Sequence, residues 1–332
     1  MDASNIEPLY ICRLSRCLNA SVYGRATDEM PAFPSTGRQY PSSGARMTQT
    51  QEHSDLHASD NFSLPMTFPL VARPAGTPYR NIVGKMSRFL ARNVATKRLT
   101  MRNTRPMVTF TFDDVPATAC ELGVRLLEQY GTHGTFYVAG AGCERNSPVG
   151  VLASIDQLRA VYSKGHEIGC QTFSHVAVSS LGRRELELEY SRNQSALKRI
   201  AGNLQVRNFS YPYGDLSFRA RLQLETLFDS CRSIDPGINV GIADLGLLKA
   251  CTLDDRSIDR AEISRLVAAT ARTNGWLIFL SHDVCDEPSR FGVRPDLLEF
   301  ALCNAQQAGL QPVTISQGLR SARGTAPAGQ TT

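Results

Sequence analysis

From Met107 onward, segments with the pattern of a buried strand alternate with segments with the pattern of an amphipathic helix. Such alternation requires parallel pairing of the strands, because each helix returns the chain to the end where the previous strand began. It predicts an α/β layer structure or barrel, with its chemistry at the carboxyl ends of the strands. The expected strands are 108–112, 135–138, 166–170, 208–211, 247–253, 276–280 and 311–315, and the expected helices are 119–130, 155–162, 184–200, 219–228, 260–273 and 295–308.

The two ends of the chain lack this pattern. Residues 1–80 are expected to be a disordered or loosely attached extension, 81–106 a basic lead-in, 107–320 the folded domain and 321–332 a disordered tail. Residues 1–106 hold 14 of the 36 Lys and Arg and 7 of the 31 Asp and Glu, so they carry +7 and the remainder −2. The basic lead-in suits a membrane surface or an anionic polymer, but a solvated helix packing one apolar side on the domain is favoured. The nearly neutral domain lacks the excess of basic residues that is typical of nucleic-acid binding.

Nine scattered cysteines without a CxxC pair match neither a disulfide scaffold nor a zinc ribbon. The sequence shows no secretory signal pattern, and no apolar run approaches the ~20 residues of a transmembrane helix. A soluble cytoplasmic protein is therefore expected. Nothing in the sequence indicates the oligomeric state.

Polar residues with catalytic chemistry follow several expected strands. Asp113 and Asp114 end the first, His175 follows the third, a Pro212-Tyr213 turn follows the fourth, and His282 follows the sixth. Two adjacent carboxylates are costly to bury unless a cation, a shared proton or an open cleft accommodates them. Each histidine alone is more often structural, but the convergence of all these groups at strand ends favours an active site.

The motifs and their order resemble the NodB-type polysaccharide deacetylases, carbohydrate esterase family four, between about Met107 and Leu319. The matching stretches are Thr111-Phe112-Asp113-Asp114, Tyr130-Gly131-Thr132-His133-Gly134-Thr135-Phe136-Tyr137, Gly165-His166-Glu167-Ile168-Gly169-Cys170-Gln171-Thr172-Phe173-Ser174-His175, Phe209-Ser210-Tyr211-Pro212-Tyr213-Gly214 and Leu280-Ser281-His282.

The resemblance implies a distorted (β/α) barrel that removes N-acetyl groups from an oligo- or polysaccharide containing N-acetylglucosamine. It implies Asp113 as the general base and His282 as the general acid, with the Tyr213 backbone N–H as an oxyanion donor. It also implies Asp114 and His175 as ligands of a divalent metal, zinc first, with cobalt, manganese or magnesium as alternatives. The implied substrate pocket is made by Leu280, Pro212 and Tyr211.

Two positions depart from the family pattern. Gln171 stands where the family has a second histidine ligand, and a neutral amide oxygen is a poor donor to zinc. Ser210 stands where many members have an arginine that orients the base. The aspartate that supports the acid histidine in the family falls at Asp254 or Asp255.

Three functions therefore remain open from sequence. The first is a metal-dependent polysaccharide deacetylase. The second is an inactive carbohydrate-binding relative with a damaged metal site. The third is a deacetylase or amidase acting on a non-sugar amide, since fold and metal chemistry do not determine the substrate. The single tryptophan, Trp276, lies inside an expected strand, which mildly favours a short substrate.

Overall fold

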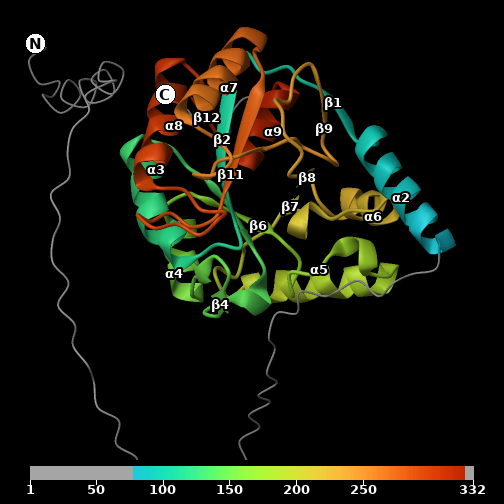
Figure 1. Ribbon diagram of the computed structural model, residues 1–332. Helices are drawn as coiled ribbons and strands as arrows, with labels where there is room; N and C mark the ends of the chain where they lie inside the picture. The colour runs from blue at the N-terminus through green and yellow to red at the C-terminus, as the bar shows by residue number, and fades with distance from the viewer. Residues whose placement is uncertain (1–77, 326–332) are drawn as a thin grey trace, which may run out of the picture. The chain divides into compact units, whose positions relative to one another are not determined.

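A parallel sheet organises the part of the chain that the computed structural model describes, residues 78–325 (Figure 1). The strand order is β10-β11-β2-β3-β6-β7-β8, and β12 also pairs with β2. The α/β prediction is confirmed, with the strands curved as in a half-barrel. The strands are β2 (Met107–Asp113), β3 (Thr135–Val138), β6 (Glu167–Cys170), β7 (Asn208–Ser210), β8 (Ser230–Arg232), β10 (Cys251–Thr252), β11 (Trp276–Ser281) and β12 (Gln311–Pro312).

Helices and short elements complete the described residues. The helices are α2 (Pro78–Asn93), α3 (Val124–Gln129), α4 (Ile155–Ser163), α5 (Arg183–Leu197), α6 (Phe218–Leu227), α7 (Arg260–Thr273), α8 (Pro295–Gln307) and α9 (Ile315–Arg323). The π-helical turn η1 (Ala119–Gly123) leads into α3, and single 3-10 turns are η2 (Gly140–Gly142), η3 (Val178–Ser180) and η4 (Pro212–Gly214). Two antiparallel ribbons pair β1 (Arg98–Thr100) with β9 (Ile242–Asp244) and β4 (Asn146–Ser147) with β5 (Gly150–Val151).

The central strands β2 and β11 divide the core into two clusters. Along β11, Leu277 and Phe279 belong to one cluster, whereas Trp276, Ile278 and Leu280 belong to the other. Successive side chains of a strand point to opposite faces, so the sheet is covered on both sides. All seven residues of β2 are buried, which places its terminal carboxylate inside the protein.

Strands β12 and β3 pair with different parts of β2. Strand β12 pairs with Met107 and Val108 of β2, whereas β3 pairs with the other end of β2, from Thr111 to Asp113. Helix α9 follows β12 and packs on the junction. There the indole nitrogen of Trp276 donates to Thr109 Oγ1 at 2.9 Å, and a Cβ added to Gly318 would lie 2.4 Å from the indole ring.

Several expected boundaries are corrected. Of 247–253, only Cys251 and Thr252 form a strand, because Leu248 instead bridges β8 and lies beside Arg232. The expected strand 311–315 ends at Pro312, and Thr314 caps α9 by accepting from the Gln317 amide.

The limits of the outer segments also differ from expectation. Helix α2 begins at Pro78, inside the range expected to be disordered, and α9 extends to Arg323, past the expected domain end at 320. Strand β8 was not predicted from the sequence at all. The disorder expected at the two ends of the chain otherwise concerns residues 1–77 and 326–332, which lie outside the described part. Gly324 and Thr325 are described and follow the end of α9.

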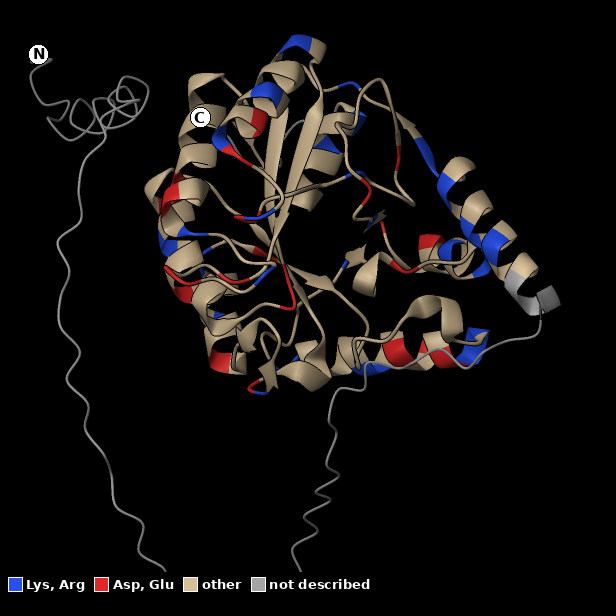
Figure 2. Ribbon diagram, viewed as in Figure 1, with Lys and Arg blue, Asp and Glu red and all other residues tan. Residues whose placement is uncertain are grey.

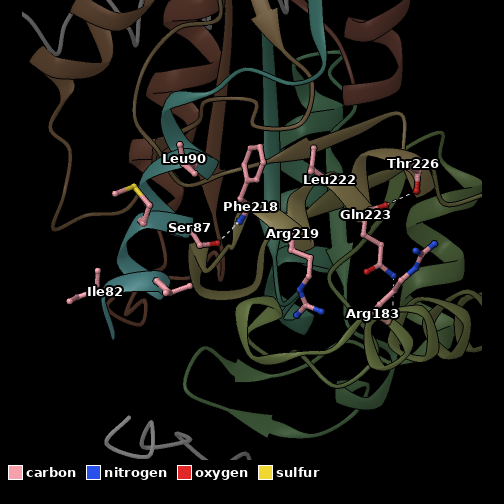
Figure 3. Close-up of a pocket in the computed structure, with 11 residues that line it drawn as sticks. Ile82, Ser87, Leu90, Arg183, Phe218, Arg219, Leu222, Gln223 and Thr226 are labelled. Carbon is pink, nitrogen blue, oxygen red and sulfur yellow. Dashed lines mark hydrogen bonds between the residues drawn. The ribbon is translucent and has the colours of Figure 1, made fainter. Parts of the chain in front are cut away.

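The basic lead-in forms helix α2, which lies beside α6 (Figure 1). Within the described residues the helix has basic but no acidic side chains (Figure 2). Ser87 Oγ accepts from the Phe218 amide at 3.0 Å, and an apolar groove of about 840 Å³ lies between the two helices (Figure 3). The sequence favoured a helix that packs one apolar side on the domain. This packing holds only for Leu90 and Ala91, because Ile82, Met86 and Phe89 remain more than half exposed.

Candidate active site

The carboxyl ends of neighbouring strands bring the predicted site residues together. In the parallel registers, Phe112 pairs with Ser281 and Asp113 pairs with Tyr137. The loop that carries His175 leaves β6, and the turn that carries Tyr213 leaves β7. All the predicted catalytic and metal-binding side chains therefore belong to one edge of the sheet, as the strand pattern predicted.

Asp113 is buried and held from strands β7 and β8. Its Oδ1 accepts from the Arg232 guanidinium, and its Oδ2 accepts from Ser210 Oγ at 3.3 Å. The same guanidinium nitrogen of Arg232 also donates to Ser210 Oγ. The side chain of Arg232 is 0% exposed and that of Asp113 is 5% exposed, so this is a buried ion pair.

Arg232 was not identified from the sequence. It lies on β8, a three-residue strand of Ser, Cys and Arg that carries no apolar alternation. Its guanidinium lies 5.0 Å from the centre of the Tyr137 ring. Burial raises the pKa of Tyr137 far above its usual value, so this phenol stays neutral. The sequence carries no signal for this role, because nothing in the residues around Arg232 shows that it is buried beside Asp113.

Asp114 and His175 form the second polar pair. Asp114 Oδ1 lies 2.9 Å from His175 Nε2. Both atoms are buried, and neither has any other hydrogen-bond partner. Burial opposes ionisation of Asp114, but His175, His282 and Arg232 outweigh it and lower the pKa of this carboxyl below 3.8. Asp114 is therefore ionised at neutral pH, with its free oxygen turned towards an imidazole nitrogen.

Gln171 does not take the place of a metal-binding histidine. Its side chain is buried, and its Oε1 accepts from the Asp114 backbone N–H at 3.0 Å. Within residues 78–325, no three His, Cys, Asp or Glu side chains are placed to hold a metal ion together. The donor set at this edge is thus one carboxylate oxygen, one imidazole nitrogen and an amide oxygen already engaged by the backbone.

Helix α5 supports the loop that carries His175. Glu189 Oε2 accepts from the backbone N–H groups of Phe173 and Ser174, at 3.0 and 2.8 Å, and its Oε1 accepts from Ser174 Oγ at 3.1 Å. One turn further along α5, the Asn193 side chain donates to Val138 O at 2.9 Å. Neither Glu189 nor Asn193 was predicted from the sequence, because polar residues within a helix are usually exposed to solvent.

The backbone of the site loops is unusual for its residue types. Asp114, Val115, Thr172, His175 and Tyr213 all have φ between 50° and 60°. A positive φ is uncommon outside glycine and is a true outlier for β-branched residues such as Val115 and Thr172. Such strain costs ~1–3 kcal/mol per residue and clusters at functional sites. The positive φ values therefore support this edge as the site.

Tyr213 is the most solvent-accessible residue of the set, with 63% exposure. Its ring lies 4.6 Å from the His175 ring, centre to centre. Its φ of 59° belongs to a turn in which the Gly214 N–H donates to Tyr211 O at 2.9 Å. An added Cβ on Gly214 would lie 2.4 Å from the Ile234 side chain, so the turn also requires glycine after Tyr213.

His282 stands alone on its Nδ1 side. This nitrogen is buried without a hydrogen-bond partner, and the ring lies 5.3 Å from Phe291, centre to centre. Asp254 instead accepts from two backbone N–H groups, and Asp255 pairs with Arg294 at 2.7 Å. No hydrogen bond joins either aspartate to His282, so the expected support of this histidine is not found.

The three expected pocket residues differ in position. Leu280 and Pro212 are buried at the site edge. Tyr211 lies in the larger core cluster, and its hydroxyl donates to Gly246 O at 3.0 Å. Tyr211 packs in one core cluster as Leu280 does in the other, so its place in the pocket stays a prediction. None of the predicted site residues lines the groove between α2 and α6.

The fold and the site define a class: a parallel α/β protein with carboxylates and histidines at the carboxyl edge of its sheet. Comparison with known proteins then shows which family this part of the chain resembles. Residues 100–227 match the polysaccharide deacetylase family model. The resemblance to the NodB-type deacetylases is confirmed, over a stretch that is less than half of the chain.

The chain is similar to a chitooligosaccharide deacetylase of Sinorhizobium fredii, with 26% identity over 54% of this chain and 73% of that protein. It is also similar to chitin deacetylase 1 of Cryptococcus neoformans, with 29% identity over 33% of this chain but only 22% of that protein's length. A chitin deacetylase structure from Colletotrichum lindemuthianum aligns with a TM-score of 0.49 and 19% identity, over 68% of this chain and 92% of that one. Among the described residues, no helix has the length and apolar character to cross a bilayer.

Proposed function

We propose that this protein is a metal-dependent hydrolase that removes N-acetyl groups from an N-acetylglucosamine-containing oligo- or polysaccharide. The observation that carries the proposal is the joint placement of the buried Asp113 and the Asp114–His175 pair at one sheet edge with His282. The family match and the likeness to a chitooligosaccharide deacetylase support a sugar amide as the substrate.

The residues of this chain divide the reaction among them. Asp113 accepts a proton from the attacking water, with its two oxygens oriented by Arg232 and Ser210. The Tyr213 backbone N–H donates to the oxygen that becomes negative as the carbonyl carbon turns tetrahedral. His282 gives a proton to the leaving amine nitrogen. Leu280 and Pro212 provide apolar wall for the acetyl methyl group.

The donors at Asp114 and His175 fit a divalent cation held by two protein atoms. Their Oδ1 and Nε2 atoms lie 2.9 Å apart and otherwise lack hydrogen bonds, as two ligands of one ion would. Gln171 is not included, because its oxygen is occupied by the Asp114 N–H. Zinc is first by family resemblance, with cobalt, manganese and magnesium as alternatives. A cation bound there would polarise the amide carbonyl and acidify a water molecule.

The test is acetate release from N-acetylated chitooligosaccharides, with and without added zinc, cobalt or manganese. We expect release that is abolished by a chelator, and a loss of about 10²–10⁴-fold for Asp113→Asn, since a general base contributes that much. Asp156→Asn, on an exposed helix face, should retain activity. Activity that survives Asp113→Asn would contradict the assignment of the base.

A second candidate is an inactive carbohydrate-binding relative. The buried Gln171 with its engaged oxygen favours this candidate, because it leaves the cation with one ligand fewer than the family has. Calorimetry with the same oligosaccharides distinguishes the two: binding without acetate release under every metal supports the inactive relative. Acetate released only from non-sugar amides would support the remaining alternative. The cytoplasmic location stays a prediction.

A further inference from the structure

We propose that Arg232, supplied by strand β8, is the positioning residue that orients the Asp113 carboxylate in place of an arginine at position 210. The inference rests on the proposed function, because it assigns a role within the same reaction. The residue lies beyond the part of the chain that the family model matches, residues 100–227.

The contacts of Asp113 show how its orientation is set. Arg232 donates to Oδ1, and Ser210 donates to Oδ2 at 3.3 Å, so each oxygen has its own donor. Arg232 is itself anchored, since its Nη1 donates to Ser233 O at 3.0 Å and the Tyr137 ring covers its guanidinium. A carboxylate held at both oxygens keeps one orientation, which leaves its remaining lone pairs for a proton from water.

The strand register explains why the arginine can come from β8. Ser210 and Arg232 are directly paired residues in the parallel ladder of β7 and β8. Both side chains point to the same face and reach the same carboxylate. The small serine leaves space that a long side chain at position 210 would fill. A guanidinium from either strand would therefore occupy the same volume beside Asp113.

Stability is a weak reason for this buried pair. Replacing a buried ion pair with well-packed apolar residues is often neutral or stabilising, because desolvation offsets the attraction. The chain contains a second fully buried arginine, Arg221, which pairs with Glu225 and Asp244 away from the predicted site residues. Arg221 is thus a control that is equally buried and also paired with carboxylates, but away from the predicted site.

The experiment measures kcat, KM and the thermal midpoint of five variants: Arg232→Met, Arg232→Lys, Arg232→Ser, the exchange Ser210→Arg with Arg232→Ser, and Arg221→Met. For Arg232→Met we expect kcat to fall about 100-fold while KM changes less than about threefold, the pattern of a lost transition-state interaction. Arg232→Lys keeps the charge but lacks the planar guanidinium. Its kcat should therefore lie between those of the wild type and Arg232→Met. Arg221→Met should lower the thermal midpoint but leave kcat unchanged wherever it is folded.

The exchange variant decides between positioning and packing. If the guanidinium can act from either strand, the exchange variant should recover at least about tenfold in kcat over Arg232→Ser. Wild-type kcat in Arg232→Met, or a folded exchange variant no better than Arg232→Ser, would overturn the proposal.

A stability measurement distinguishes failure of the proposed function from failure of this inference. If the wild-type protein releases no acetate from any substrate, thermal midpoints of Asp113→Asn, Arg232→Met and the double variant still test the pair. A double variant less destabilised than the sum of the single losses shows that the two residues are coupled. Additive losses would overturn the pairing on which the inference depends.

Discussion

At the scale of single residues, the decisive position is Gln171. Its amide oxygen is not free for a cation, because it accepts the backbone N–H of Asp114, a residue with a left-handed φ of 58°. Gln171 therefore stabilises the turn that presents Asp114 and does not itself bind a metal ion in this arrangement. The sequence identified the substitution but not this hydrogen bond, which depends on how the loops after β2 and β6 meet.

We expect Gln171→His to bind zinc about 10–100-fold more tightly than the wild type, because it adds an imidazole where the amide is a poor donor. Calorimetric titration of the metal-free protein measures this directly. Gln171→Leu is the control, since it also removes the acceptor for the Asp114 N–H but adds no ligand. Equal zinc affinity in all three proteins would show that position 171 has no part in metal binding.

At the scale of elements, long regular segments were predictable and short polar ones were not. Strands β2 and β11 and helix α7 have enough apolar or helical residues to reveal their periods. Strand β8 has three residues, and two of them are polar, yet all three are buried. Asp113 was thus recognisable from its motif, whereas its arginine partner was not, since only tertiary pairing brings Arg232 to Asp113.

Helix α5 is expected to govern the stability of the His175 loop. Glu189→Ala removes a buried carboxylate that accepts three hydrogen bonds from Phe173 and Ser174. We expect a loss of roughly 2–4 kcal/mol in the free energy of unfolding, since bonds to charged groups are stronger than neutral ones. Urea unfolding measures the loss.

Glu187→Ala is the matched control on the same helix, because its carboxylate is half exposed in a pair with Arg183. Its effect should stay within about 0.5 kcal/mol, as for most surface positions. If the two variants lose equal stability, the hydrogen bonds between Glu189 and the His175 loop contribute nothing to the free energy of unfolding.

At the scale of the whole molecule, a buried histidine links stability to pH. Burial, with a smaller effect of the neighbouring His133, lowers the pKa of His166 to about 4 from 6.5. Its Nδ1 accepts from the Gly134 N–H at 3.0 Å, which requires the neutral ring. The unfolded chain takes up the proton first, so stability is full above pH 6.5 and declines as the pH falls towards 4.

We expect this histidine to account for roughly 2–3 kcal/mol of the stability lost between about pH 7.5 and about pH 4.5. His166→Asn keeps an acceptor near Gly134 but cannot titrate, so its urea-unfolding free energy should depend less on pH. His133→Asn, at an exposed position, should retain most of the wild-type dependence. An unchanged pH dependence in His166→Asn would assign the loss to other groups.

The contact between Trp276 and helix α9 gives the protein a built-in optical reporter. The chain has one tryptophan, so its tryptophan emission, excited selectively over the tyrosines, comes from a single place at the amino end of the sheet. The ring is fully buried against Gly318, and its nitrogen is bound to Thr109. Emission should therefore be blue-shifted in the native state and should move to longer wavelength when α9 separates from the sheet. Because the predicted site lies at the carboxyl ends of the strands, this signal should report on the contact between α9 and the sheet and not on ligand binding at that site.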